Sequence, residues 1–194
     1  MTAHYLCHST YPVREGDVTL VHAAAGGVGL LLVQMIKARG GYVVATTSSE
    51  EKMALARAAG ADETIPYEGF GDRLRELGGA HVVYDAIGAT TFEEGMDALR
   101  ARGMMVLYGM ASGPAPAVDP QGLQARSLYL TRPGLPAYTA TREELLQRSG
   151  DVLGWIADGS LDVRIGRRYP LEDARRAHED LEARRSTGKL ILVP

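Results

Sequence analysis

The stretch that decides the fold is DVTLVHAAAGGVG, residues 17–29. Its first part, residues 17–23, is short, apolar and rich in β-branched side chains, which predicts a buried strand. The glycines that follow open a helix predicted over residues 27–39. A strand, a glycine turn and a helix in this order are typical of the dinucleotide fingerprint, here with Ala24 at the place of its first glycine. Such a turn lets the backbone approach a pyrophosphate, and the N-terminus of the helix attracts that group.

The same alternation continues on the C-terminal side of this stretch. Further strands are predicted over residues 42–46, 63–65, 81–85, 104–109 and 127–131, with helices over residues 50–59, 70–77 and 91–101. Strands and helices that alternate at this spacing imply right-handed crossovers and a parallel sheet covered on both faces. The predicted fold class is therefore α/β, a doubly wound six-stranded parallel sheet of the Rossmann type.

The pattern becomes less regular after residue 109. We predict a loop over residues 112–120, a helix over 142–157, an extended segment over 161–165, a helix over 171–185 and a strand over 189–193. These last elements do not continue the alternation. We therefore divide the chain into a Rossmann domain, residues 1–150, and a C-terminal segment, residues 151–194.

Composition excludes several classes of protein. The chain has 194 residues, of which 45% are hydrophobic and 23% charged, as expected of a globular domain. Its net charge of −3 argues against nucleic acid as a partner, and its longest apolar run is too short to span a membrane. The single cysteine, Cys7, is interpreted as a free thiol in a reducing compartment, and no secretory signal precedes it, so we predict a cytoplasmic location. The histidines show no pairing typical of metal ligands, and neither a metal site nor an acid–base catalyst is assigned.

The end of the second strand bears on the choice of cofactor. NAD sites usually place an acid there, whereas NADP sites lack the acid and add a cation. Residues 46–49 read TTSS, without an acid. Glu50 and Glu51 follow closely and could take the NAD role, but they also fit the first turn of a helix that Ser48 or Ser49 caps. Lys52 lies in reach of a 2′-phosphate, so the residues favour NADPH over NADH.

Two polar residues at strand ends keep more than one interpretation. Asp85 ends the fourth strand, where it either caps the turn at Ile87 and Gly88 or lies near the cofactor. His22 precedes the glycine turn and is interpreted as a packing or edge residue.

Several motifs together are similar to those of one family. They are HAAAGGVG (22–29), YDAIG (84–88), YGMASG (108–113), LTRP (130–133), TREEL (141–145), YPL (169–171), AH (177–178) and TGK (187–189). In this order they resemble the zinc-free, medium-chain NADPH:quinone oxidoreductases, also called zeta-crystallin-like quinone reductases, over essentially the whole chain. The glycine turn is shared with enoyl reductases of the same superfamily. The stretch at residues 131–133 is typical of a narrower group of proteins, the quinone oxidoreductases.

The resemblance implies roles for particular residues. Lys52 and Tyr67, joined by Arg184, would contact the NADP phosphate, and residues 108–110 would lie on the nicotinamide side, where Met110 replaces the polar residue of some relatives. With the glycine turn, the predicted cofactor-binding residues are Ala25, Gly26, Gly27, Val28, Gly29, Thr46, Thr47, Ser48, Lys52, Tyr67, Gly88, Tyr108, Gly109, Met110 and Arg184.

The resemblance also implies what the rest of such a protein contains. Family members carry a GroES-like catalytic domain before the helix that corresponds to residues 2–5, and residues 161–194 resemble the segment that completes it. The chain is then a cofactor domain with a C-terminal remnant, expected to bind NADPH with little or no turnover. In the intact family, hydride passes from NADPH to a quinone, and the strand from Ser127 to Thr131 pairs across a homodimer axis. The alternatives are an enoyl-thioester reductase and a non-enzymatic, dimeric NADPH-binding module.

Overall fold

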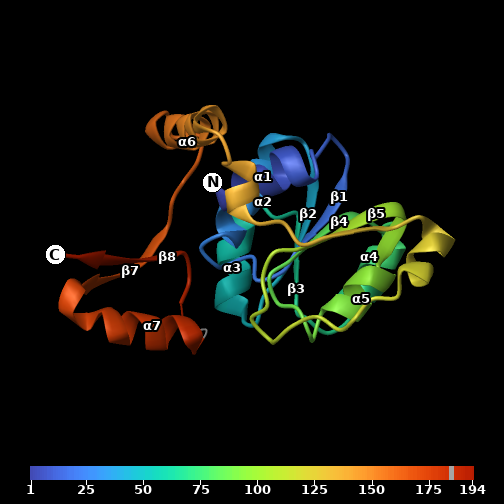
Figure 1. Ribbon diagram of the computed structural model, residues 1–194. Coiled ribbons are helices and arrows are strands. Elements are labelled where there is room, and N and C mark those ends of the chain that lie inside the picture. The colour runs from blue at the N-terminus through green and yellow to red at the C-terminus, as the bar shows by residue number, and fades with distance from the viewer. Residues whose placement is uncertain (184–185) are drawn as a thin grey trace.

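The centre of the molecule is a six-stranded parallel sheet (Figure 1). The computed structural model describes residues 1–183 and 186–194. The strand order is β3-β2-β1-β4-β5-β6, and every neighbouring pair is parallel. The strands are β1 (Val18–Val21), β2 (Tyr42–Thr46), β3 (Glu63–Ile65), β4 (Ala80–Asp85), β5 (Leu99–Leu107) and β6 (Tyr129–Thr131). This is the strand order of the Rossmann fold, and it confirms the predicted fold class.

Helices cover both faces of the sheet because successive residues of a strand point to opposite sides. Val21 packs with residues of α2 (Gly29–Ala38), such as Val33, in one buried cluster. Leu20, the residue before it, packs in the other cluster with Phe70 of α4 (Phe70–Glu76) and with a residue of α5 (Phe92–Asp97). The helix α3 (Glu50–Ala58) contributes to the first cluster.

The predicted helix over residues 91–101 is too long. The helix α5 ends at Asp97, and Leu99 already pairs with Ala80 of β4. The next pair is Val82 with Met104, so the residues between Leu99 and Met104 bulge out of the ladder. Good local helix propensity is overridden here by pairing within the sheet. At β6, Ser127 adopts a left-handed φ of 51°, and the strand begins at Tyr129 instead of residue 127.

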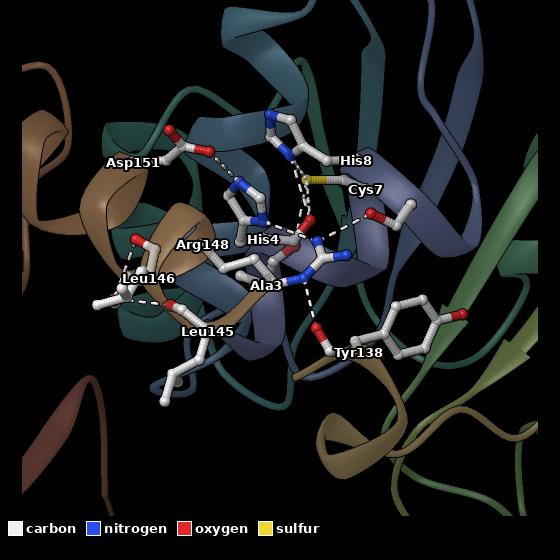
Figure 2. A network of polar contacts seen from close by, with 11 residues as sticks. Ala3, His4, Cys7, His8, Tyr138, Leu145, Leu146, Arg148 and Asp151 are labelled. Carbon is white, nitrogen blue, oxygen red and sulfur yellow. Dashed lines mark hydrogen bonds and ion pairs between the residues drawn. The ribbon is translucent and has the colours of Figure 1, made fainter. Parts of the chain in front are cut away.

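A polar network joins the N-terminal helix to a helix late in the chain (Figure 2). The helix α1 (Thr2–Tyr5) continues into one π-helical turn, η1 (Leu6–Thr10), and faces α6 (Arg142–Ala157). His4 Nε2 lies 3.1 Å from Asp151 Oδ2, and Arg148 Nε donates to the Tyr138 carbonyl oxygen at 2.6 Å. These contacts hold the middle of α6 against α1 and against the residues that precede α6.

The C-terminal elements lie to one side of the large sheet (Figure 1). They are β7 (Ile165–Pro170), the 3₁₀ turn η4 (Leu171–Asp173), α7 (Ala174–Glu182) and β8 (Lys189–Val193); β7 and β8 form a separate parallel pair. The strand at 189–193 is as predicted, but the strand before it begins where the predicted extended segment 161–165 ends. Of the helix predicted over 171–185, residues 171–173 form a 3₁₀ turn and 174–182 the helix, and residues 184–185 lie outside the described residues. The boundary at residue 150 falls inside α6, and the division into two parts stays a prediction.

Two short 3₁₀ helices complete the description. They are η2 (Pro120–Arg126), before β6, and η3 (Leu135–Tyr138), after it. Within the described part of the chain, no helix is both long and apolar enough to cross a membrane.

Candidate nucleotide-binding site

The turn between β1 and α2 is compact and closely packed. Ala23 adopts a φ of 51°, and the N–H of Gly26 donates to its carbonyl oxygen at 2.9 Å. A Cβ on Gly29 would lie 2.7 Å from the Ala24 carbonyl carbon and would also press on the Ala23 oxygen. Only glycine therefore lets α2 begin this close to the strand, as the third glycine of the fingerprint requires.

The first turn of α2 is open to an anion. Its N-cap residue is Val28, which makes no side-chain cap. The backbone N–H groups at the start of a helix have no partners within the helix, and the helix dipole adds a partial positive charge there. A phosphate group satisfies both conditions.

A pocket of about 260 Å³ lies beside this turn. It gathers residues that follow β1, β2 and β4, the strands on either side of the point where the strand order reverses. Ligands of such sheets bind at this point. The lining residues are Ala23, Ala25, Gly26, Thr47, Ser48, Lys52, Tyr67, Ile87, Thr90, Ala111, Leu181 and Ser186.

The charged residues after β2 differ in their position relative to the pocket. Lys52 lines it, and the Lys52 ammonium donates to Ser48 Oγ at 3.2 Å. Ser49 caps α3, since its hydroxyl accepts from the Lys52 N–H at 3.3 Å. Glu50 pairs with Arg57 along α3, and neither Glu50 nor Glu51 belongs to the pocket lining. The site therefore presents a cation to a ligand at this point.

Tyr67 links the pocket to the glycine turn. Its hydroxyl accepts a hydrogen bond from the Ala23 N–H at 3.2 Å. The amide of a residue with a left-handed φ is thus satisfied by a side chain that also lines the pocket.

Thr46 lies behind the pocket and not in its lining. Its side chain is fully buried, and its Oγ1 is 2.7 Å from His22 Nδ1. Burial lowers the pKa of His22 to about 4, so its imidazole is neutral near pH 7. His22 Nε2 has no hydrogen-bond partner among the described residues, and the edge of Phe70 meets its ring. The packing role predicted for His22 agrees with this environment.

The hydrogen bonds of Asp85 show that it caps the turn after β4, the first of the two roles considered for it. Its Oδ1 accepts from the N–H groups of Ile87 at 2.6 Å and Gly88 at 3.0 Å. Its Oδ2 accepts from the Thr91 hydroxyl at 2.9 Å. With three donors on one buried carboxylate, Asp85 shapes the turn after β4.

The predicted residues after β4 and β5 form the next part of the sheet edge. Tyr108 and Gly109 donate their N–H groups to the Asp85 carbonyl oxygen, and a Cβ on Gly109 would lie 2.8 Å from the Ala86 carbonyl carbon. Gly88 has a left-handed φ of 90°. Met110 is exposed, with its sulfur 3.7 Å from an Arg132 nitrogen. Gly88, Tyr108, Gly109 and Met110 do not line the pocket, whereas the neighbouring Ile87 and Ala111 do.

One predicted site residue, Arg184, lies outside the residues that the structure describes. Other residues of the pocket lining were missed by the sequence-based prediction. Ile87, Thr90 and Ala111 were not predicted, although their position after strand ends could have indicated them. Leu181 and Ser186 come from the C-terminal segment, and no local pattern points to their place beside the glycine turn.

This fold and site define a dinucleotide-binding domain of the Rossmann type. The chain belongs to the zinc-binding dehydrogenase family, whose model matches residues 27–148. It is 44% identical over 202 residues to a quinone oxidoreductase of Salmonella typhimurium, covering 100% of this chain and 62% of that protein. It is 39% identical to a 2-haloacrylate reductase of a Burkholderia species, covering 100% of this chain and 60% of the relative.

The chain is also similar to the solved structure of a quinone oxidoreductase. The Escherichia coli quinone oxidoreductase complexed with NADPH superposes with a TM-score of 0.94 at 41% identity, covering 100% of this chain and 62% of that one. The chain thus spans less than two thirds of the length of these relatives. In residues 1–183 and 186–194, no group of three or more His, Cys, Asp or Glu side chains could hold a metal ion.

Proposed function

We propose that this chain is the NADPH-binding part of a zinc-independent oxidoreductase that transfers hydride from NADPH to a quinone. The observation that carries the proposal is the position of Lys52, which lines the pocket beside Ser48 while Glu50 and Glu51 do not. A lysine in the lining, with both glutamates outside it, favours a 2′-phosphate over a 2′-hydroxyl. The similarity to quinone oxidoreductases, one of them solved with NADPH, supports the same cofactor and substrate.

Each part of the site has a role in this proposal. Ala25, Gly26, Gly27, Val28 and Gly29 receive the pyrophosphate at the start of α2. Lys52 and Tyr67, with Thr47, Ser48 and the predicted Arg184, receive the adenosine end, and Thr46 holds this region from behind. Gly88, Tyr108, Gly109 and Met110 face the nicotinamide end. NADPH supplies a hydride when it is bound, and the residues of this chain bind and orient it.

We further propose that the chain alone binds the cofactor with little or no turnover. The relatives are longer, and in this proposal the remainder is a catalytic domain that residues 151–194 help to complete. Large apolar side chains of the C-terminal elements, among them Ile165, Leu171 and Leu192, are exposed, which is consistent with a missing neighbour. A cytoplasmic location is part of the proposal, supported by the buried free thiol of Cys7.

A homodimer through the strand at Ser127 to Thr131 is the proposed assembly. β6 is an edge strand of the six-stranded sheet, and its Tyr129 and Leu130 are exposed. An uncovered edge strand can pair with a copy of itself. Sedimentation of the wild-type chain and of Tyr129→Lys tests this: a dimer that the variant converts to a monomer is expected, and a wild-type monomer contradicts it.

The cofactor is tested by calorimetric titration of the chain with NADPH and, separately, with NADH. Clear preference for NADPH is expected. Preference for NADH would contradict the proposal and point back to Glu50 or Glu51. Binding of neither would mean that this chain does not form the site by itself.

A reductase of activated alkenes, such as an enoyl thioester, is the second candidate. The similarity to a 2-haloacrylate reductase favours it, because that relative is named for an alkene substrate. Since little turnover is proposed for the chain alone, the two are separated by its residual oxidation of NADPH with a benzoquinone and with an enoyl thioester. A residual rate with the quinone supports the first proposal, and a residual rate with the thioester alone supports the second. Absence of both rates, with NADPH bound, agrees with a chain that only binds, which a non-enzymatic NADPH-binding module also predicts.

A further inference from the structure

The start of β8 lies directly on the glycine turn. The Gly188 N–H donates to the Ala25 carbonyl oxygen at 3.1 Å, and Gly188 forms an isolated parallel bridge with Gly26. A Cβ on Gly27 would lie 2.9 Å from the Gly188 oxygen and 3.2 Å from the Lys189 ammonium nitrogen. Because it has no side chain, Gly27 therefore leaves space for a segment from the far end of the chain.

Lys189 is held in place at this turn, close enough to the α-amino group of Met1 for its charge to lower the pKa of that amine. Its N–H donates to the Arg164 carbonyl oxygen at 2.8 Å, which fixes its backbone. Its side chain is half-buried, and burial lowers the pKa of its ammonium group. Across residues 1–183 and 186–194, no side-chain hydrogen bond or ion pair is formed by this ammonium group. A desolvated cation without an anion is unfavourable, and an anionic ligand removes that cost.

The ligand that this arrangement fits is a diphosphate. The N-terminus of α2 is the positive end of the helix dipole, and its N-cap residue, Val28, provides no side-chain cap for the first N–H groups. Lys189 adds a full positive charge beside the same turn, near Gly27. The N-terminus of α2 and Lys189 together suit a group with more than one negative charge, such as a diphosphate.

We propose that Lys189 binds the pyrophosphate of the dinucleotide at the glycine turn. This inference rests on the proposed cofactor site and adds a residue to it. It also assigns different phosphates to two lysines. Lys52 would contact the 2′-phosphate, which NADPH alone carries, and Lys189 would contact the pyrophosphate, which NADPH and NADH share.

A purely structural role for Lys189 makes a different prediction. Its Cδ would lie 3.0 Å from a Cβ on Gly27, so its methylene groups pack against the turn. Methionine has a similar length and no charge, so Lys189→Met keeps most of the packing and removes the cation. Lys189→Arg keeps the cation.

The test is calorimetric titration of the wild-type chain, Lys189→Met, Lys189→Arg and Lys52→Met with four ligands: NADPH, NADH, ADP and 2′-AMP. Lys189→Met is expected to weaken NADPH, NADH and ADP by about tenfold to a hundredfold, as for the loss of a charge-assisted hydrogen bond, and to leave 2′-AMP unchanged. Lys189→Arg is expected to retain most of the affinity. Lys52→Met is the matched control, which weakens NADPH and 2′-AMP and leaves NADH and ADP unchanged.

Two results would overturn the inference while the cofactor site stands. One is a Lys189→Met chain that binds NADH and ADP as wild type does. The other is an equal loss for all four ligands, which means that the variant disturbs the turn. If the wild-type chain binds none of the four, the proposed cofactor site fails, and this inference fails with it.

A second measurement needs no variant. Burial lowers the pKa of Lys189, and burial together with the charge of Lys189 lowers the pKa of the Met1 α-amino group. A bound diphosphate raises the pKa of cations beside it, so the chain should take up protons when it binds ADP at alkaline pH. Titrations in buffers of different ionisation enthalpy measure this uptake. Binding without proton uptake across the alkaline range would contradict the contact.

Discussion

The Nδ1 atom of His22 lies 2.7 Å from the hydroxyl oxygen of Thr46, which joins the ends of β1 and β2 inside the fold. Both residues are fully buried, and the second ring nitrogen of His22 has no partner within the described residues. The next residues along the chain, Ala23 and Thr47, both line the pocket, so the pair lies directly behind its lining. Because His22 is fully buried, its protonation state affects the stability of the fold.

His22 makes the fold sensitive to acid. Burial lowers the pKa of His22 to about 4 in the folded chain, whereas an unfolded histidine has a pKa of about 6.5. The unfolded state therefore binds the proton first, and the stabilisation present above about pH 6.5 is lost as the pH falls toward 4. The loss from His22 alone is as much as about 3 kcal/mol. Urea denaturation at a series of pH values measures it.

His22→Gln should have a shallower decline over the same range because glutamine does not titrate. His178→Gln is the control, since His178 is exposed on α7, and it should keep the wild-type slope. Identical slopes for His22→Gln and the wild-type chain would show that His22 is not the acid-sensitive group.

Tyr67→Phe tests two roles of the Tyr67 hydroxyl, in the stability of the turn and in the binding of NADPH. The change leaves the Ala23 N–H without its acceptor, which lowers the free energy of unfolding by about 1–3 kcal/mol. NADPH should bind several-fold more weakly than to wild type. Tyr42→Phe, which removes a hydroxyl bonded to Glu63 at 2.7 Å away from the pocket, is the control and should leave NADPH affinity unchanged. Unchanged stability of Tyr67→Phe would contradict the role of its hydroxyl in the turn.

Local patterns predicted the elements that local interactions form. The strand before the glycine turn, the turn itself and α3 with its Ser49 cap depend on residues close together in the chain, so their places follow from the sequence. Asp85 stayed open because a carboxylate at a strand end fits both a cap and a ligand contact. Only the positions of the Ile87 and Gly88 amides decide between them.

Long-range pairing explains what the sequence could not predict. Residues 99–101 have ordinary helix propensity, yet Leu99 joins β5 because Ala80 pairs with it. β7 contains Arg167 and Arg168 and lacks an apolar alternation, so its extended form depends on β8 beside it. Lys189 meets Gly27 for the same reason, since the pairing of Gly188 with Gly26 brings the two together.

Asp85→Ala should be one of the most destabilising single changes in the sheet edge. It removes the acceptor for two backbone amides and the Thr91 hydroxyl, all near a buried carboxylate. Hydrogen bonds to a charged group contribute roughly 1.5–3 kcal/mol, so a loss of about 3 kcal/mol or more is expected. Chemical denaturation measures it. Asp97→Ala is the control, because Asp97 is exposed and its one ion pair among the described residues, with Arg126, is long at 3.7 Å. A change below about 1 kcal/mol is expected there.

The same substitution at two helical glycines should change stability in opposite directions. At Gly29 a Cβ would lie 2.7 Å from the Ala24 carbonyl carbon, so the backbone of the turn must move. Gly29→Ala should therefore lower the free energy of unfolding by about 1–3 kcal/mol and weaken the binding of NADPH and NADH alike. At Gly150, in the middle of α6, nothing lies within 4 Å of the added Cβ. Gly150→Ala should instead raise stability by about 0.5–1 kcal/mol and leave binding unchanged, because alanine has the higher helix propensity. Urea denaturation and NADH titration of both variants check this pair, and a stabilised Gly29→Ala would show that the turn has room for a side chain.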